Sequence, residues 1–432
     1  MSTEVVGSIG IGVLIVLMLA RIPIGFAMAL VGLFGLTYLE SIKYALAVFG
    51  TVPYHEVAQY AISVVPLFVL MGTVVSNAGL SRDLYDAAHM WLGQLPGGLA
   101  IATIGGCAGF ASICGSSMAT AVTMGKVALP EMRKHGYDTA LATGAVASGG
   151  TLGILIPPSL GFIIYGILTE QSVGDLFIAG ILPGVLLTTL FMIYILVIAS
   201  RNPQLAPAGQ KTSFRDKIAS LKLTWPIPTL FLLVMGGIYM GVFTPTEAGG
   251  IGAFGAIVIT GCTRRLSGQM LGRSAVETAQ TTAMIMVIII GTFIFMHFLT
   301  ISKLPFALAG FVSGLPLPAL GVFGVVVFIY LILGMLLDIM AAMVLTLPIV
   351  YPVMVAIGFD PIWLGVVIVI LMEAGLITPP VGMNIFVLGG LTDTSLGTIF
   401  RGVLPFVVAM LVCIVILTIF PQIPLLLLSL MR

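Results

Sequence analysis

Charge is scarce in this sequence. Of its 432 residues only 8% are Asp, Glu, Lys or Arg, whereas 59% are hydrophobic and the mean hydropathy is +1.21. Ordinary soluble domains carry about 25% charged residues, so this composition excludes a soluble fold of this size. The net charge of +1, without any dense basic run, gives no support to a nucleic-acid partner.

Cysteine and histidine are scarce as well. The four cysteines, Cys107, Cys114, Cys262 and Cys413, stand in apolar segments without a CxxC pair, and the four histidines show no metal-ligand spacing. Small buried packing residues account for such cysteines. The sequence therefore lacks the clustered metal ligands or nucleophiles of a membrane enzyme, and we expect neither catalysis nor an organic cofactor.

Long apolar runs dominate instead. Stretches of about 20 hydrophobic residues, the length of a helix that crosses a bilayer, recur from end to end. The first of them, "STEVVGSIGIGVLIVLMLA", begins acidic and lacks a basic n-region, so it is predicted as a spanning helix rather than a cleavable signal peptide. The composition predicts an all-α polytopic membrane protein.

Turn and charge signals divide the chain into two halves joined by a polar linker at 201–224. In the first half, 1–200, the predicted crossings are 5–20, 23–39, 57–78, 139–169 and 177–200, with a paired segment at 99–131. In the second half, 225–432, they are 225–243, 246–263, 275–301, 361–391 and 403–420, with a paired segment at 319–352. The same plan occurs twice.

Each paired segment is predicted to be a re-entrant hairpin. Residues 99–131 allow arms of about 16 residues, or roughly 24 Å of helix, against a hydrocarbon core of about 30 Å. The central "ASICGSSMA" supplies an uncharged Gly-Ser turn. A turn of this kind suits a cavity inside the membrane better than water.

An internal repeat supports the two-half plan. At an offset of 222 residues, Gly153, Pro157 and Pro158 align with Gly375, Pro379 and Pro380. The same offset aligns Pro130, Met132, Gly136 and Asp138 with Pro352, Met354, Gly358 and Asp360. Because each half has an odd number of crossings, the second half is expected to be inverted relative to the first.

Charge placement predicts the orientation. With the N-terminus outside, cytoplasmic loops hold 13 Lys and Arg residues and outer loops hold three, while Lys126 falls within the first hairpin. This asymmetry fits the positive-inside rule. We expect both termini to be periplasmic, with the first hairpin entering from the cytoplasmic side, the second from outside, and the two tips meeting near the midplane.

The two Pro-Pro breaks are candidate binding elements. Pro157 and Pro158 remove backbone donors, and Gly150 and Gly153 are expected to let the backbone adopt other angles. The break should expose carbonyls that suit Na⁺ and leave a free half-helix N-terminus that suits an anionic substrate. A proline kink that serves only packing is the alternative, and the recurrence of the break in both halves weighs against it.

Two acidic residues stand in apolar surroundings, where an ionisable side chain is costly unless it is paired or bound to an ion. Asp338 aligns with Ser116 and is a candidate sodium ligand or proton carrier, or else a helix cap at the hairpin turn. Glu373 is the second candidate, and pairing with a neighbouring helix is the alternative for it. Glu247, in "FTPTEAGG", is predicted to be a structural acid in a first helical turn.

Five segments together resemble the large membrane subunit of tripartite ATP-independent periplasmic (TRAP) transporters, the DctM-like family. They are "GFASICGSSMATAVTMGKVALPEMRKHGYD", "ASGGTLGILIPPS", "GVFTPTEAGG", "GMLLDIMAAM" and "EAGLITPPVGMNIFV". The similarity runs along essentially the whole chain, and the pair "ILIPPS" and "LITPPVG" is highly specific in combination.

The resemblance implies an elevator-type, sodium-coupled importer of an organic acid, such as a C4-dicarboxylate or sialic acid, in the bacterial inner membrane. Carried over, the sodium sites fall on hairpin tips and broken-helix backbone: Ser116, Ser117, Gly149, Gly150, Gly153, Asp338, Gly375 and Thr378. The expected substrate contacts are residues at and near the two breaks: Ser148, Thr151, Pro158, Ser159, Glu373, Pro380 and Asn384.

The resemblance also implies partners: a periplasmic substrate-binding protein and a small four-helix membrane subunit. Some members of the family fuse the small subunit to the N-terminus, but this chain starts at the first large-subunit helix, so a separate small subunit is expected. A stand-alone dicarboxylate symporter shares the hairpin plan, and proton coupling through Asp338 or Glu373 stays open. An ion channel is disfavoured because no filter sequence is repeated.

Overall fold

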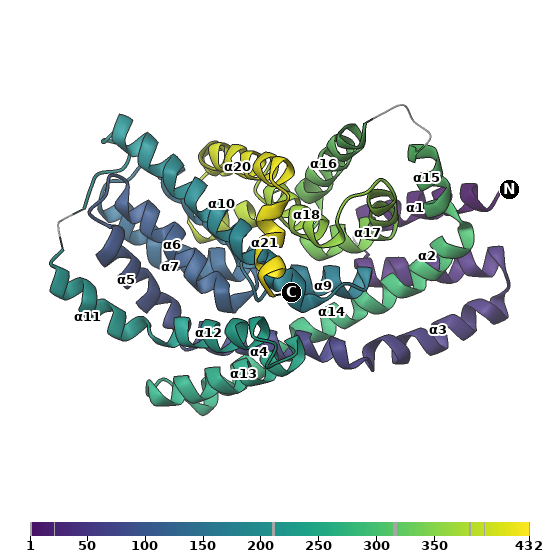
Figure 1. Cartoon of the computed structure of the whole chain (residues 1–432), viewed down its shortest axis with the longest axis horizontal. Helices are drawn as coiled ribbons and strands as arrows, with labels where there is room; N and C mark the ends of the chain where they lie inside the picture. Colours follow the sequence, from purple (N-terminus) through teal and green to yellow (C-terminus); the bar gives the residue numbers. More distant parts are fainter. Residues whose placement is uncertain are drawn as a thin grey trace.

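The computed structural model describes residues 2–20, 22–209, 212–313, 318–379, 382–392 and 394–431, and within these ranges every regular element is a helix (Figure 1). Among the described residues, six helices are long and apolar enough to cross a membrane, or eight if each bent pair is one span. The prediction of an all-α polytopic membrane protein is confirmed.

The helices of the first half follow the chain in this order: α1 (Thr3–Leu19), α2 (Ile24–Leu39), α3 (Ile42–Val57), α4 (Val64–Asn77), α5 (Leu80–Leu92), α6 (Gly98–Cys114), α7 (Ser117–Lys134), α8 (Thr139–Leu155), α9 (Leu160–Thr169) and α10 (Val173–Arg201). A 3₁₀ turn, Tyr60–Ser63, leads into α4.

The second half contains α11 (Phe214–Thr224), α12 (Pro226–Tyr239), α13 (Pro245–Cys262), α14 (Gly268–Ser302), α15 (Leu304–Ser313), α16 (Ala319–Leu336), α17 (Ile339–Ala356), α18 (Pro361–Leu376), α19 (Met383–Leu391), α20 (Leu396–Ile419) and α21 (Gln422–Met431). Helix α17 begins and ends 222 residues after α7, and α18 begins 222 residues after α8. The helix bounds thus follow the offset seen in the sequence.

Several predicted bounds are wrong. Helix α3 occupies a stretch expected to be a loop, α11 lies in the polar linker, and α21 lies beyond the last predicted crossing. Polar N-caps start two of these helices, since Ser41 accepts a hydrogen bond from the Tyr44 amide (3.2 Å) and Ser213 from the Asp216 amide (3.4 Å). The hairpin arms are 17 or 18 residues long rather than 16.

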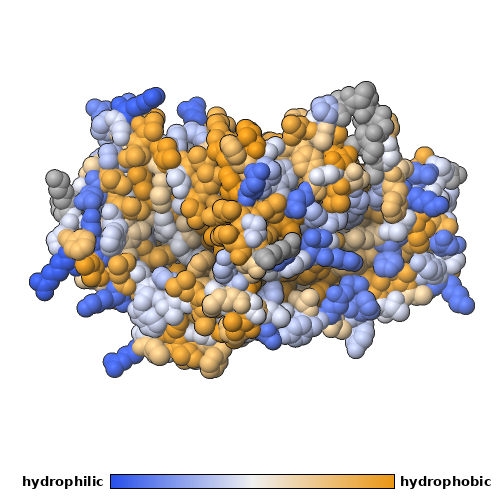
Figure 2. Space-filling model, in the orientation of Figure 1, coloured by the Kyte–Doolittle hydropathy of each residue, from blue (hydrophilic) through white to orange (hydrophobic). Residues whose placement is uncertain are grey.

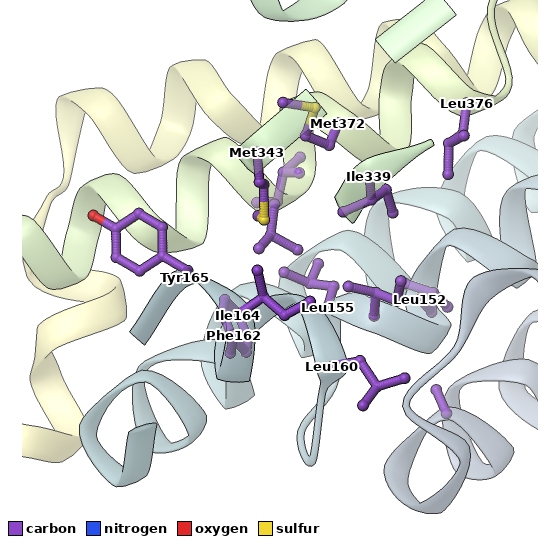
Figure 3. Packing of buried hydrophobic residues seen from close by; sticks show 14 of the residues in the cluster. Leu152, Leu155, Leu160, Phe162, Ile164, Tyr165, Ile339, Met343, Met372 and Leu376 are labelled. Carbon is purple, nitrogen blue, oxygen red and sulfur yellow. The ribbon is translucent and has the colours of Figure 1, made fainter. Parts of the chain in front are cut away.

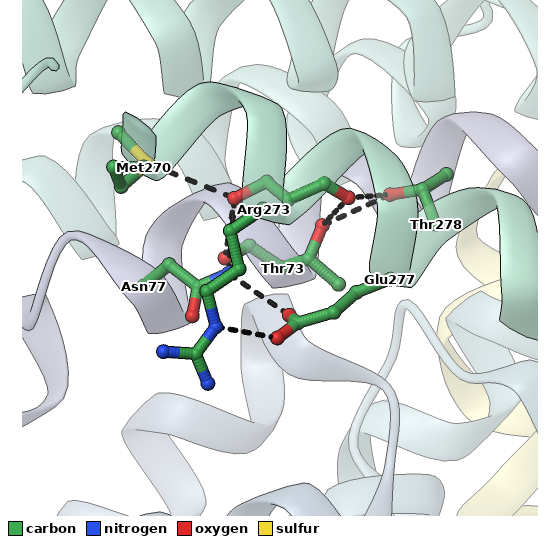
Figure 4. A network of polar contacts seen from close by, with 7 residues as sticks. Thr73, Asn77, Met270, Arg273, Glu277 and Thr278 are labelled. Carbon is green, nitrogen blue, oxygen red and sulfur yellow. Dashed lines mark hydrogen bonds and ion pairs between the residues drawn. The ribbon is translucent and has the colours of Figure 1, made fainter. Parts of the chain in front are cut away.

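One group of helices forms a layer around α14, which packs along α2 and α4, while α13 packs against α4. Figure 4 shows the polar contacts that fix α4 to α14. The Asn77 amide donates to Ser274 Oγ (3.0 Å) and to a Glu277 carboxylate oxygen (2.9 Å), and Arg273 Nε donates to the other oxygen (2.8 Å). These bonds hold the two helices in a fixed register.

A second group contains the hairpins and the broken helices. Helix α8 packs against α6, α7 and α20, and α18 packs against α16, α10 and α20. The molecule is elongated in Figure 1, and Figure 2 shows broad apolar surface over much of the face drawn. Exposed aromatic side chains such as Phe34 and Tyr38 belong to α2 in the layer around α14, here called the outer layer, as expected for residues that face lipid.

Candidate functional site

The first hairpin turns where the sequence predicts it. Helix α6 ends at Cys114, Gly115 has a φ of +64°, and Ser116 caps α7 by accepting a hydrogen bond from the Ala119 amide (3.4 Å). A positive φ at the turn favours glycine because other residues rarely adopt it. The tip therefore presents backbone and hydroxyl groups without a charged side chain.

This tip fits into the first broken helix. The Gly115 carbonyl accepts a hydrogen bond from the Leu160 amide at 3.4 Å. A Cβ atom on Gly153 would stand 2.5 Å from the Ser116 carbonyl oxygen, and one on Gly150 would stand 2.7 Å from Ala121 Cβ. The prediction that Gly150 and Gly153 loosen the backbone is wrong, because both lie in regular helix. Glycine is needed at both positions because the first hairpin packs so closely against α8 that a Cβ atom would not fit.

The first break separates α8 from α9, whose axes differ by 41°. The peptide bond between Pro157 and Pro158 is cis. Because residues 157 and 158 have no N–H, the carbonyls of Gly153 and Ile154 have no donor at i+4. Two acceptors at the end of α8 are thus left without their normal helical partner, close to the tip of the first hairpin.

The N-terminus of α9 is not free, which corrects the sequence-based expectation. Ser159 is fully buried and its hydroxyl accepts a hydrogen bond from the Phe162 amide (3.3 Å). The Leu160 amide is used by the Gly115 carbonyl. The protein itself therefore satisfies the Leu160 and Phe162 amides of the first turn of α9, which leaves less for a ligand to gain there.

The second break differs. Helix α18 ends at Leu376, where the Thr378 amide donates to the Gly375 carbonyl (2.9 Å) and the Thr378 hydroxyl to the Ala374 carbonyl (2.6 Å). Helix α19 begins after Gly382, which has a φ of +61° and provides no side-chain cap. Pro380 lies outside the described residues. Of the two half-helix N-termini, only that of α19 lacks a side-chain cap.

The second hairpin turns at Asp338. Its carboxylate accepts a hydrogen bond from the Ala341 amide (3.0 Å), so the residue does cap α17, one of the roles considered for it. The hairpin also meets α18 closely, since a Cβ atom on Gly334 would stand 2.9 Å from the Gly375 Cα. Gly375 is therefore a packing glycine, like Gly153.

Both hairpins reach the last turns of α18. Glu373 lies two residues before Gly375, is 1% exposed, and has neither carboxylate oxygen in a hydrogen bond within the described structure. The Ser117 hydroxyl of the first hairpin lies near that carboxylate, but the two groups do not form a hydrogen bond. Glu373 forms no ion pair with a basic residue on a neighbouring helix among the described residues, so the structure gives no support to that alternative.

Within the described parts of the chain, three expected substrate residues carry buried polar atoms without a partner. They are the Ser148 hydroxyl, both oxygens of Glu373 and the Asn384 Nδ2. Thr151, also buried, donates to the Ser148 carbonyl (2.6 Å). Most buried polar groups in proteins are hydrogen-bonded, and the helices that carry these three, α8, α18 and α19, contact one another. Buried polar groups of both halves thus meet near the breaks.

An apolar wall closes the site toward α9 and the second hairpin. Figure 3 shows Leu152 and Leu155 of α8 packed with Leu160 of α9, close to Ile339 and Met343 of α17 and to Met372 and Leu376 of α18. Tyr165 donates its hydroxyl to the Pro361 carbonyl (2.7 Å) and so joins α9 to the start of α18. The remaining sodium candidate, Gly149, packs against Cys107 of α6.

The sequence-based prediction missed one feature, a cavity beside α7 lined by Lys126, Arg133 and Lys134. The available signal was Lys126, a cation within an apolar hairpin. Glu247 lies away from the site, and it forms a capping box with Thr244 as predicted.

A many-spanning helical chain with two helical hairpins and two broken helices around buried polar groups belongs to the class of membrane transport proteins. The family model described as "Tripartite ATP-independent periplasmic transporter, DctM component" matches residues 11–423. The chain therefore belongs to the DctM family of large TRAP permease subunits, and its relatives are transporter subunits rather than enzymes. It is a multi-pass membrane protein of a TRAP transporter.

Named relatives agree. The C4-dicarboxylate TRAP transporter large permease protein DctM of Pseudomonas aeruginosa is 38% identical over 368 residues, covering 85% of this chain and 86% of that protein. The isethionate TRAP transporter permease protein DctMQ of Oleidesulfovibrio alaskensis is 35% identical over 87% of this chain and 60% of its own length. The YdaH transporter of Alcanivorax borkumensis is similar in fold, with a TM-score of 0.63 at 16% identity, covering 86% of this chain and 88% of that chain.

Proposed function

We propose that this subunit uses a sodium gradient to import a small organic anion, such as a C4-dicarboxylate or sialic acid, received from a periplasmic binding protein. The observation that carries the proposal is the set of buried, unpartnered polar atoms on Ser148, Glu373 and Asn384 at the two breaks. Leaving such groups unpaired costs several kcal/mol, and a bound ion and a bound carboxylate would supply their partners.

The cation is assigned to the groups that carry negative charge or free carbonyls. The Gly153 and Ile154 carbonyls, the Ser116 and Ser117 tip, and Glu373 lie around the first hairpin. Unwound carbonyls of this kind coordinate Na⁺ in transporters with broken helices. A cation bound beside the buried Glu373 would keep its carboxylate ionised, and the ionised group would repel a substrate carboxylate, so the proposal places this residue on the cation side. In the second half, Asp338, Gly375 and Thr378 form the matching candidate set.

The anion is assigned to α19. Its N-terminus has no side-chain cap at Gly382, and although the Ile385 amide donates to the Gly382 carbonyl (2.8 Å), the Met383 and Asn384 amides have no intrahelical partner and carry a partial positive charge that favours a carboxylate. Asn384 in its first turn offers a buried Nδ2 donor. The charge asymmetry of the sequence supports periplasmic termini and an inverted second half. Movement of the hairpins and broken helices against the outer layer, as in an elevator, would then carry the site across the membrane.

Reconstitution tests the proposal. The chain is inserted in proteoliposomes with its small subunit and supplied with the binding protein and radiolabelled succinate or sialic acid. We expect uptake that follows the inward sodium gradient and is lost without the binding protein. Uptake by this chain alone would support a stand-alone symporter instead. Uptake indifferent to Na⁺ but abolished by dissipating a proton gradient would assign Glu373 or Asp338 to proton coupling.

A further inference from the structure

A cavity of about 1030 Å³ opens beside the second arm of the first hairpin. Its walls come from α7, the first turns of α8, the end of α19 and the start of α20. Small-molecule sites measure about 300–1,000 Å³, so the cavity is roomy enough for a small organic anion together with water. Thr143 and Thr398 add hydroxyl groups to the wall.

The charged residues in the described lining of the cavity are all cationic. Lys126, Arg133 and Lys134 line it, and none of the described lining residues is acidic. The ion pairs in the described ranges involve other residues, so these three charges have no partner there. A recess lined by charges of one sign between low-dielectric walls focuses its potential and raises the local concentration of the opposite charge about 10- to 1,000-fold.

Simpler explanations cover two of the three cations. Arg133 and Lys134 lie in the last turn of α7, where they complement the helix dipole, and near a loop where the positive-inside rule places basic residues. Lys126 stands in the middle of α7, away from both. A charge at this place in an apolar hairpin requires water or an anion beside it.

The cavity adjoins the elements of the proposed site. Helix α7 runs from the Ser117 tip to Lys126, about 13 Å at 1.5 Å per residue. Helix α19 runs from Asn384 in its first turn to the cavity wall at Leu391 and Thr392, about 12 Å along. The two helices pack against each other, with Gly125 facing Leu388.

Building on the proposed function, we propose that this cavity is the vestibule through which the organic anion leaves the site toward the cytoplasm. Lys126 is its inner anion-binding residue, and Arg133 and Lys134 form its mouth. The ligand class is a small carboxylate held by ammonium and guanidinium groups and exchanged with water. No tight pocket is needed, because a release path must bind its ligand weakly.

The first test reads the cavity without transport. The four cysteines are replaced, Lys126→Cys is introduced, and the full chain is placed in zwitterionic vesicles. Labelling rates are compared for a sulfonate-bearing and a trimethylammonium-bearing methanethiosulfonate, each normalised to free cysteine. We expect the anionic reagent to be favoured at least about tenfold, with the preference lost when Arg133→Gln and Lys134→Gln are added. Lys222→Cys on the exposed helix α11 should show no preference.

Ligand protection separates an anion path from a lipid site. Millimolar succinate should slow the anionic labelling of Lys126→Cys at least about threefold, within the focusing expected of the cavity. Protection by acidic phospholipid vesicles but not by succinate would overturn the proposal in favour of a lipid headgroup site. Equal rates for both reagents would overturn it as well.

The second test is uptake. Lys126→Gln should lower the initial rate about tenfold, Lys126→Arg should retain most of it, and Lys222→Gln should leave it unchanged. Normal uptake by Lys126→Gln would overturn the vestibule while leaving the proposed function intact. Selective labelling and succinate protection in a chain that shows no sodium-driven uptake would overturn the proposed function and leave the anion cavity standing.

Discussion

Gly153 sits where the tip of the first hairpin meets α8, and adding one methyl group there tests the assignment of the sodium site. A Cβ atom at this position would lie 2.5 Å from the Ser116 carbonyl oxygen and 2.7 Å from the Thr120 hydroxyl. Ordinary contact begins near 3.4 Å, so Gly153→Ala requires the tip to retreat by about 0.9 Å. The obstacle is backbone, which cannot rotate away.

The expected magnitude follows from two opposing terms. Alanine improves helix propensity by up to about 1 kcal/mol, whereas overpacking costs about 1–3 kcal/mol. A net loss of about 0–2 kcal/mol in unfolding free energy is therefore expected. The larger effect should fall on sodium, because the displaced carbonyl and the Ser116–Ser117 tip are candidate ligands. The sodium concentration for half-maximal uptake should rise at least about tenfold, which corresponds to about 1.4 kcal/mol.

Gly324→Ala is the matched control, because Gly324 lies in α16 of the other hairpin and a Cβ atom there meets nothing within 4 Å. This variant should transport like the wild type and unfold at the same or a slightly higher temperature, because alanine improves helix propensity there without a clash. Uptake by the reconstituted complex is measured across a sodium series, with thermal unfolding measured in the same detergent. If Gly153→Ala keeps wild-type sodium dependence while its unfolding temperature falls, the glycine serves packing alone and the sodium assignment is refuted.

Substitutions at two acidic residues test their assignment to the cation. Asp338→Asn keeps a capping oxygen for the Ala341 amide but removes the charge, so the variant should keep its thermal stability and lose sodium-dependent uptake. Asp338→Ala should lose sodium-dependent uptake and also about 0.5–2 kcal/mol of stability. Sodium-dependent uptake by Asp338→Asn would show that the residue serves only as a cap. Glu373→Gln removes a buried unpaired carboxylate at nearly constant volume. The unfolding temperature of this variant should therefore rise, while its sodium-coupled uptake falls at least about tenfold. Unchanged sodium dependence in this variant would contradict the assignment of Glu373 to the cation.

The breaks and turns were predictable because local chemistry sets them. Adjacent prolines stop a helix wherever they occur, and the predicted limits 139–169 and 361–391 coincide with the outer ends of α8–α9 and α18–α19. Helix α3 was missed for the opposite reason. It contains Lys43, His55 and Glu56, and polar residues hide a helix from a search for apolar runs.

Contacts between distant segments were not predictable from a single sequence. The closeness of Gly153 to Ser116, and of Gly375 to Gly334, depends on how the hairpins pack, which no local pattern encodes. The same holds for the orphaned carboxylate of Glu373: the sequence shows an acid in an apolar run, but only packing shows that no basic side chain comes near enough to form an ion pair in the described structure.

The two repeats differ where it matters for the anion. The Ser159 side chain caps the N-terminus of α9. At the N-terminus of α19 the cap position is Gly382, which provides no side-chain cap, although the two helices occupy equivalent places in the repeat. Duplication alone would leave both ends alike. The substrate is therefore expected to use α19, and the α9 end is expected to serve structure.

Gly382 allows this asymmetry to be tested directly. Asparagine tolerates a positive φ and is a good helix cap, so Gly382→Asn should place an acceptor on the first-turn amides of α19 and compete with the substrate carboxylate. Gly382→Ala adds the same Cβ atom, 3.2 Å from the ends of Ile385 and Phe400, without an acceptor. The substrate concentration for half-maximal uptake should rise at least about fivefold more in Gly382→Asn than in Gly382→Ala, in line with a cap worth about 1 kcal/mol. Equal shifts in the two variants would show strain alone and would remove α19 as the anion site.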